Sequence, residues 1–308
     1  MSTKIEAVKV DQTFKHPQVK YPKIMPQHPF SMLVLAPKGS GKTNMICNLL
    51  LNHYKGYFHK ILIASPTIDN DPKWDVIQKT KHILKENKPL EKALGNRQKE
   101  EEPVFDVVRK SGGEKQSVVD KKKNEFSGKI PKDSFFASMD ELPGRLAVQT
   151  ETIAKLHELG KEQESLFISD RILVILDDQA GLFQGGNTNN PMVNIVIKHR
   201  HFNMSIIVVT QANKAIPKTI RTNCNSLVCF EIPNLAELKT VYEEWPTDLP
   251  EEAWTRAYKF ATEKNFSFMY VNNHFPKGHR MFRNFETKLQ FAKRSSLPSK
   301  KRKREEDE

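Results

Sequence analysis

The chain has 308 residues and a formal net charge of +12, which favours a polyanionic partner such as nucleic acid, although acidic proteins and membrane surfaces also attract a basic chain. A chain of this length can bury the core of one enlarged domain, but no apolar stretch reaches the roughly 20 residues of a membrane span, and the first residues lack the apolar core of a signal peptide. The three cysteines, Cys47, Cys224 and Cys229, show no CxxC spacing, which argues against a disulfide framework or a zinc site.

The first 29 residues form a polar, basic stretch that is interrupted by Pro17, Pro22, Pro26 and Pro29. Proline lacks the backbone N–H that regular elements use and restricts the preceding residue to extended conformations. We therefore expect residues 1–29 to be an extended basic segment, and the domain to begin at residue 30.

An apolar run over residues 31–36 breaks into a glycine-rich loop that ends in Gly41, Lys42 and Thr43, and a helix-like segment follows to about residue 54. This is the layout of a phosphate-binding loop, in which backbone N–H groups and the N-terminus of the helix face the anion. The residues expected to bind a nucleotide are Ala36, Pro37, Lys38, Gly39, Ser40, Gly41, Lys42 and Thr43.

Within this loop, Lys42 is expected to neutralise β- and γ-phosphate oxygens, and the Thr43 hydroxyl is expected to coordinate Mg²⁺. Ala36 stands where the consensus GxxxxGK[ST] has its first glycine, a change that adds only a methyl group. The extended segment before the loop is then expected to lie over the nucleotide or on a neighbouring subunit.

A second strand is expected at residues 60–66, and the composition then changes. From about residue 81 to residue 133 the chain is rich in Lys, Glu, Asn, Gln and Gly, which is too polar to build a core and predicts a mobile or partly helical insertion. Between residues 138 and 165 the spacing of leucine and isoleucine predicts helix, interrupted near residues 143–144.

Five consecutive apolar residues at 172–176 predict a strand that is buried on both faces, as in a parallel sheet, and Asp177 and Asp178 follow at its end. Ligands of open α/β sheets bind at the carboxyl ends of the strands. We expect Asp177 to meet Mg²⁺ through its water shell and Asp178 to face the attacking water.

A further apolar strand at residues 204–210 ends in Gln211, which is expected to orient the nucleophilic water or to sense the γ-phosphate, with a simple turn-forming role as the alternative. Before this strand, a flexible loop at residues 181–190 leads into a helix near residues 191–200. After it we expect a strand at 226–232, helices near 234–243 and 250–263, and a hairpin-like pair of strands at 266–271 and 281–285.

The order of a phosphate loop, an acidic strand and a strand with a polar end predicts an α/β fold of the P-loop NTPase class (RecA/ASCE-like), with a mostly parallel central sheet flanked by helices. We expect this domain to span residues 30–290. Residues 291–308 form a charged tail, and its basic part, residues 299–304, is expected to be a nuclear import signal, a DNA contact or simply solvated chain.

Four sequence features together resemble the poxvirus-type DNA-packaging ATPases of the FtsK/HerA superfamily of DNA motors. They are the run at 31–43, the Leu-Asp-Asp strand end, residues 198–205 leading into a strand that ends in Thr-Gln, and the Ile-Pro-Lys-Thr-Ile-Arg-Thr-Asn run at 216–223. The resemblance covers roughly residues 28–235, with a gap across the charged insertion. Asp178 departs from it, because these motors more often carry Glu at this position.

The resemblance implies an ATP hydrolase that uses ATP and Mg²⁺ to translocate double-stranded DNA, in a virus the packaging of the genome into a capsid. It also implies a homo-oligomeric ring, pentameric or hexameric, capsid proteins as further partners, and a location inside the infected cell. Motors of this kind complete each site with an arginine from the neighbouring subunit. Arg200 lies in the matching position, and Arg221 is the alternative as a finger or second sensor.

Three other functions remain to be weighed. One is a DNA translocase or helicase-like ATPase without a role in packaging. Another is a basic nucleic-acid-binding protein with a vestigial nucleotide site, which the retention of Lys42, Thr43, Asp177 and Asp178 argues against. The third is a GTPase switch, which would need an NKxD motif, and the nearest match, residues 213–216, lacks the aspartate.

Overall fold

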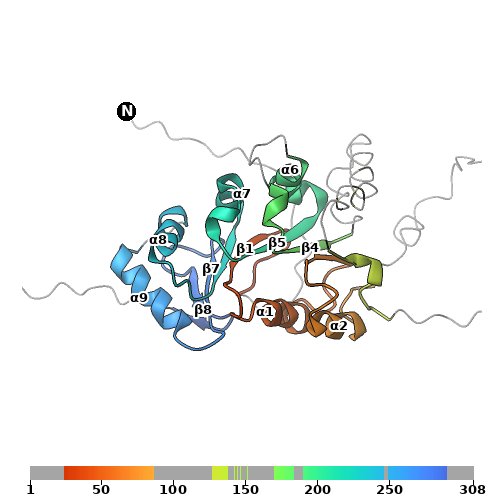
Figure 1. Cartoon of the computed structure of the whole chain (residues 1–308), viewed down its shortest axis with the longest axis horizontal. Helices are drawn as coiled ribbons and strands as arrows, with labels where there is room; N and C mark the ends of the chain where they lie inside the picture. The colour runs from red at the N-terminus through yellow and green to blue at the C-terminus, as the bar shows by residue number, and fades with distance from the viewer. Residues whose placement is uncertain are drawn as a thin grey trace, which may run out of the picture.

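The computed structural model describes residues 24–86, 127–137, 170–183, 190–245 and 249–289, together with residues 142, 144, 146 and 151. A nine-stranded sheet in the order β3-β2-β4-β5-β1-β6-β7-β8-β9 runs through this part of the chain (Figure 1). The strands are β1 (Ser31–Leu35), β2 (Lys60–Ala64), β3 (Phe135–Phe136), β4 (Ile172–Asp177), β5 (Met204–Thr210), β6 (Ser226–Cys229), β7 (Met269–Asn272), β8 (Met281–Arg283) and β9 (Thr287–Lys288).

The strands from β3 to β6 pair in parallel, whereas β7, β8 and β9 add to β6 in antiparallel fashion. Strand β5 lies between β1 and the acidic strand β4, so the sheet has an extra strand between the phosphate loop and the acid pair. This order confirms the predicted α/β fold of the P-loop NTPase class, and the β7–β8 pair confirms the predicted hairpin.

The central strands are buried on both faces, as their continuous apolar runs predicted. Alternate residues enter two separate cores: in β1, Leu33 and Leu35 face one core and Met32 and Val34 the other. Helices cover both faces. Figure 1 shows α1 (Lys42–Asn48) and α2 (Pro72–Lys79) on one side of the sheet, and α6 (Pro191–Lys198) and α7 (Lys218–Asn223) on the other.

The remaining helices follow the predicted positions closely. A π-helical turn, Leu49–His53, extends α1 almost to the predicted end at residue 54. Helices α8 (Leu235–Glu244) and α9 (Glu251–Thr262) contribute Val241, Trp254 and Tyr258 to the core on the α6 and α7 side of the sheet. No helix in the described ranges has the length and apolar content that crossing a membrane requires.

The described end of the N-terminal segment packs into the domain rather than lying outside it. Met25 and His28 are buried, and the His28 ring is hydrogen-bonded to Ser205 Oγ at 2.7 Å and to Asn203 Oδ1 at 2.9 Å. Ser205 lies at the start of β5, so residues 24–29 cover the amino edge of the parallel strands. The phosphate loop lies at the opposite edge of the sheet, at the carboxyl ends of the parallel strands. Residues 24–29 therefore do not lie over the loop.

The two ends of the predicted polar insertion also belong to the packed domain. Ile83, Leu84 and Ile130 are buried, and the Leu84 N–H donates to the Gly128 carbonyl at 2.8 Å. Gly128 has a φ of +62°, and a Cβ there would lie 2.7 Å from the His82 Cα, so this crossing of two chain segments requires glycine. The insertion is therefore shorter than 81–133.

Several predictions lie wholly or largely outside the described residues. They concern residues 1–23, the central part of the insertion, most of the helix predicted at 138–165, the loop at 184–189 and the charged tail. Of the predicted helix, Leu142 and Leu146 are described. Both are buried in the core that also contains Leu33 and Leu35 of β1.

Candidate active site

The glycine-rich loop joins the carboxyl end of β1 to the N-terminus of α1. It begins at Ala36, whose N–H donates to the Thr210 carbonyl at the end of β5 at 3.0 Å. Gly39 and Gly41 have φ values of +81° and +95°, which side chains rarely allow, and Gly41 is the N-cap of α1. The sequence thus folds here into a tight cradle in which backbone N–H groups are available to an anion.

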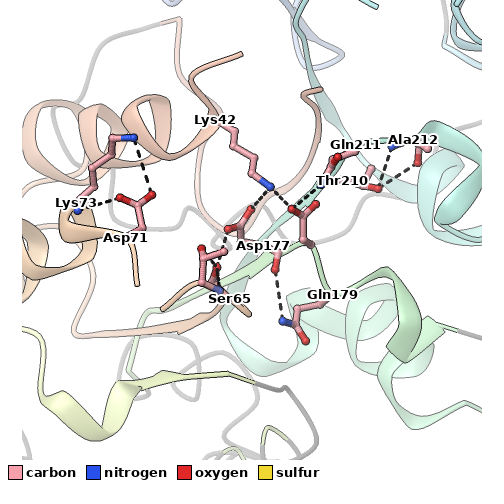
Figure 2. Close-up of polar contacts among 11 residues, drawn as sticks. Lys42, Ser65, Asp71, Lys73, Asp177, Gln179, Thr210, Gln211 and Ala212 are labelled. Atoms are coloured by element: carbon pink, nitrogen blue, oxygen red, sulfur yellow. Dashed lines mark hydrogen bonds and ion pairs between the residues drawn. The ribbon is translucent and has the colours of Figure 1, made fainter. Parts of the chain in front are cut away.

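Lys42, the first residue of α1, extends from this cradle to the two acids at the end of β4 (Figure 2). Its Nζ lies 3.2 Å from Asp177 Oδ1 and forms a second ion pair with Asp178 Oδ2. The ammonium group and the two carboxylates therefore form one cluster, although 135 residues separate Lys42 from Asp177 along the chain.

Asp177 is the most enclosed member of the cluster, with 1% of its surface exposed. The Ser65 hydroxyl donates to its Oδ2 at 2.7 Å, and its Oδ1 makes no hydrogen bond. Burial raises the pKa of the Asp177 carboxyl, and the Lys42 ammonium and the Ser65 hydroxyl oppose this rise by stabilising the charged form. The partner of Oδ1 is Lys42 Nζ, in the ion pair at 3.2 Å. A buried carboxylate beside the phosphate loop is a suitable group for holding a cation.

Asp178 has a φ of +52°, a left-handed conformation that is uncommon outside glycine. Its N–H still donates to the Val209 carbonyl of β5 at 3.0 Å, so the neighbouring strand holds this bend in place. Gln211, just beyond β5, donates from Nε2 to Asp178 Oδ2 at 3.0 Å (Figure 2). The predicted acid and the predicted polar strand end are therefore in direct contact.

Thr43 is the second residue of α1 and is buried. Lys42, Thr43, Asp177, Asp178 and Gln211 thus all lie along the carboxyl edge of the central strands, where we expected them. Among the described residues there is no group of three or more His, Cys, Asp or Glu side chains that could hold a metal ion by themselves. That is compatible with Mg²⁺, which proteins usually bind through one or two carboxylates together with substrate phosphates and water.

Two supporting residues were not predicted. Ser65 follows β2 directly and is fully buried, and Gln179 donates from Nε2 to the carbonyl of Ala137 at 3.0 Å and to that of Asp177 at 3.4 Å. Figure 2 shows both beside Asp177. The position of Ser65 immediately after an apolar strand was a usable signal, because the carboxyl ends of parallel strands meet at one edge of the sheet.

Arg200 lies far from this cluster. It is exposed and belongs to a 3-10 turn, His199–Phe202, that precedes β5 at the amino edge of the sheet. Gln211 lies at the other end of the same strand. The structure therefore does not bring Arg200 to the acids of its own chain.

Arg221 has a different environment from the one its predicted role requires. It is 8% exposed, and its Nε and Nη2 donate to the two Glu244 carboxylate oxygens at 2.7 and 2.5 Å. Its Nη1 donates to the carbonyls of Asn213 and Ile216. The guanidinium is thus occupied within its own chain, and the prediction of a finger or sensor at Arg221 is corrected to a structural ion pair between α7 and α8.

Comparison with known proteins finds a family match that covers the β4 and β5 part of this site but not the glycine-rich loop. Residues 132–243 match the family model described as "Poxvirus A32 protein", which confirms the resemblance that the motifs predicted. The matched region contains β4, β5 and the acid pair. No protein with a curated description matches the chain.

Three solved structures with a similar chain path are distant in sequence. The genome packaging NTPase B204 from Sulfolobus turreted icosahedral virus 2, in complex with AMPPCP, is 10% identical, with a TM-score of 0.44, over 80% of this chain and 93% of its own. The DNA-packaging ATPase B204 from Sulfolobus turreted icosahedral virus is 13% identical, with a TM-score of 0.42, over 80% and 95%. The type VII secretion ATPase EccC from Thermomonospora curvata is 12% identical, with a TM-score of 0.42, over 80% and 24%.

Proposed function

We propose that this protein is an ATP hydrolase that binds ATP and Mg²⁺ at the carboxyl edge of its central sheet. The observation that carries the proposal is the cluster of Lys42, Asp177, Asp178 and Gln211 beside the glycine-rich loop. These side chains come from three separate parts of the sequence, and phosphoryl transfer uses all of their chemical types.

The role proposed for each residue follows from where it lies in the site. Lys42 and the backbone of the loop would bind β- and γ-phosphate oxygens. Thr43 would coordinate Mg²⁺ and Asp177 would hold it through its water shell, and the ion would neutralise charge building up on the phosphates. Asp178 either accepts a proton from the attacking water or orients this water molecule. Gln211, which is hydrogen-bonded to Asp178, positions the same water.

We further propose that hydrolysis drives translocation of double-stranded DNA, in particular the packaging of a viral genome into a capsid. The match to the poxvirus family model supports this role, and so does the net charge of +12, because binding to a phosphate backbone needs basic side chains. The resemblance to packaging motors implies a homo-oligomeric ring of five or six subunits, in which Arg200 would serve the site of the neighbouring chain. Capsid proteins are the further partner that packaging requires.

The location that fits this function is the infected cell. The basic part of the tail, residues 299–304, would direct the protein to the nucleus or add a contact with DNA. Both roles use the same charges, and deletion of residues 299–308 separates them. Loss of DNA affinity in vitro identifies the DNA contact, whereas loss of nuclear accumulation with unchanged affinity identifies the import signal.

The experiment that tests the proposed function compares ATP turnover with and without double-stranded DNA. We expect DNA to accelerate hydrolysis by the wild-type chain and to have no effect on Lys42→Ala, which should be inactive in both conditions. Turnover by Lys42→Ala at the wild-type rate would contradict the assignment of the loop. If the rate of ATP turnover were the same with and without DNA, the assignment as an ATP hydrolase would stand but the assignment as a DNA motor would be contradicted.

The salt dependence of DNA binding gives an independent test. A motor that follows the phosphate backbone should lose affinity steeply with rising salt and should bind unrelated duplexes of equal length alike. A shallow salt dependence, or strong preference for one sequence, would count against translocation.

The GTPase alternative has a structural difficulty besides its incomplete motif. Asn213, the first residue of the nearest NKxD match, is fully buried, and its side chain donates to Glu244 Oε2 at 3.1 Å. Its amide therefore serves the Arg221–Glu244 ion pair and is not available to a guanine base.

A further inference from the structure

A pocket of about 220 Å³ opens beside the phosphate loop, on the side away from the acid pair. Its walls come from the first turns of α1 and from the chain on either side of β7 and β8, and they include Gly41, Asn44, Phe266, Asn284 and Phe285. Pockets for whole drug-sized ligands measure about 300–1,000 Å³, so this one suits a part of a ligand whose remainder lies outside it.

Phe266 is the unusual residue of this pocket. It is a large aromatic side chain with 67% of its surface exposed, and its φ is +65°. It lies in a turn closed by the Ser267 N–H, which donates to the Lys264 carbonyl at 3.0 Å. A turn residue with positive φ is ordinarily glycine or asparagine, because a bulky side chain is strained there. A strained, exposed aromatic residue is a candidate for a ligand contact.

The phenyl ring of Phe266 points to the phosphate loop. A Cβ built on Gly41 would lie 3.0 Å from Phe266 Cδ1, so the ring edge rests against the loop backbone. Of the nearby rings, Phe268 packs against Phe285 with centroids 4.9 Å apart, and Phe285 also meets the His53 ring at 5.5 Å. Burial lowers the pKa of His53, which favours its neutral ring. The pocket thus has an aromatic wall without a fixed positive charge.

The order of the strands places this pocket and the acid pair on opposite sides of β1. The acids come from β4 and meet Gln211 beyond β5, whereas the pocket adjoins β7 and β8. The phosphate loop follows β1 and lies between them. A nucleotide with its γ-phosphate at Asp178 would therefore extend its nucleoside toward Phe266.

Asn44 and Asn48 add hydrogen-bonding groups to the opposite wall. They lie one turn apart on α1, both are exposed, and both line the pocket. Asn48 Oδ1 accepts from Asn52 Nδ2 at 2.6 Å, so Asn48 offers its amide N–H groups to the polar edge of a base, whereas a side-chain amide such as that of Asn44 can both donate and accept. An aromatic face stacks on the base.

We infer that this pocket binds the purine base of the nucleotide, with Phe266 stacking on the base and Asn44 and Asn48 facing its polar edge. This inference rests on the proposed function, since it names the base site of the same nucleotide. It accounts for a strained aromatic residue at a turn position that suits glycine better.

The experiment measures binding of Mg·ATP, Mg·CTP and inorganic tripolyphosphate to the full chain by calorimetry. Wild type is compared with Phe266→Gly, which removes the ring and also relieves the positive φ, and with Phe266→Trp, which keeps a stacking face. Phe260→Ala is the matched control, because Phe260 is another exposed aromatic residue, on α9, that does not line the pocket. Thermal unfolding checks that each variant is folded, and Phe266→Gly should be at least as stable as wild type.

We expect Phe266→Gly to bind Mg·ATP about 5- to 100-fold more weakly and to bind tripolyphosphate as wild type does. Phe266→Trp and Phe260→Ala should retain affinity for Mg·ATP, and wild type should bind Mg·ATP more tightly than Mg·CTP. Unchanged affinity of Phe266→Gly for Mg·ATP, or equal weakening for ATP and tripolyphosphate, would overturn the base site while leaving the phosphate site in place. If wild type bound neither ATP nor tripolyphosphate, the proposed function itself would fail and this inference with it.

Discussion

Arg200 and Gln211 lie at opposite ends of β5, with Arg200 at the amino edge of the sheet and Gln211 in contact with Asp178, the proposed catalytic carboxylate. At about 3.3 Å per residue, the seven residues of β5 separate them by about 23 Å. An arginine side chain cannot bridge this distance. If Arg200 acts on a phosphoryl group, it must act on the nucleotide of another subunit.

This separation leads to a prediction about mixed assemblies. Arg200→Ala should bind ATP but not hydrolyse it, and Asp178→Asn should do the same for a different reason. Mixing the two variants should restore part of the ATP turnover, because some interfaces then combine an intact Asp178 with an intact Arg200. Lys198→Ala, which removes a nearby exposed charge, should remain active alone. A mixture that co-assembles but stays inactive would show that Arg200 does not act across the interface.

A second prediction separates the two acids of β4. Asp178→Asn should keep Mg·ATP bound and lose hydrolysis by orders of magnitude, because the role proposed for Asp178, beside Gln211, is to orient or deprotonate the attacking water. Asp177→Asn should mainly weaken the use of Mg²⁺, because the substitution removes a buried negative charge beside the phosphate loop. Titrating ATP turnover and ATP binding with Mg²⁺ distinguishes the two. Equal loss of nucleotide affinity in both variants would contradict this division of roles.

The third prediction concerns Ser65, whose hydroxyl donates to Asp177 Oδ2 at 2.7 Å. Ser65→Ala should raise the Mg²⁺ concentration needed for half-maximal turnover by about 10-fold, because groups that orient a metal ligand contribute this much to metal affinity. Ser226→Ala is a suitable control, since Ser226 is also fully buried but lies at the amino edge of the sheet. A Mg²⁺ requirement equal to that of the control would exclude a positioning role for Ser65.

Fourth, the Arg221–Glu244 pair should matter for stability rather than for chemistry. Its Arg221 member is 8% exposed, so Glu244→Gln or Arg221→Ala leaves a buried polar group without its partner and should lower the free energy of unfolding by about 3–5 kcal/mol. The bound Arg221 guanidinium holds the pKa of Glu244 below its usual range, so this contribution is present at neutral pH and disappears as the pH falls through that lowered pKa. Urea unfolding measures the change. An Arg221→Ala variant with wild-type stability and no turnover would restore the catalytic assignment.

A fifth prediction concerns the stability of the fold in acid. The His199 ring is buried, its Nδ1 lies 2.8 Å from the Val196 carbonyl, and its Nε2 has no hydrogen-bond partner. Burial lowers the pKa of His199 to about 4, whereas the unfolded chain takes up its proton near pH 6.5. Between these values the unfolded state binds more protons, so stability is lost as the pH falls from about 6.5 toward 4.

The expected slope from His199 alone is about 1.4 kcal/mol per pH unit. Urea unfolding at pH 7 and pH 5 should therefore show a smaller loss for His199→Gln than for wild type. His201→Gln, an exposed neighbour, should behave as wild type does. The same slope in His199→Gln and in wild type would mean that this histidine is not the group responsible.

The amino-acid sequence alone was sufficient to predict the class of fold and the centre of the site. Continuous apolar runs predicted strands that are buried on both faces, and the glycines before Lys42 predicted a phosphate-binding loop. Because parallel strands end at one edge of the sheet, polar residues directly after the apolar runs had to gather there. Asp177, Asp178 and Gln211 followed from this rule. The ion pairs of the two acids with Lys42 and the contact of Gln211 with Asp178 agree with it.

Only the tertiary structure decided which other residues belong to that site. Arg200 and Arg221 are equivalent as basic residues in the sequence, but Arg221 is bound by Glu244 from α8, and Arg200 projects from the far edge of the sheet. Phe266 shows the same limit, because its contact with Gly41 joins segments 225 residues apart. Local patterns specify backbone geometry and burial, whereas the partner of a polar or aromatic side chain is set by distant segments that only folding brings to it.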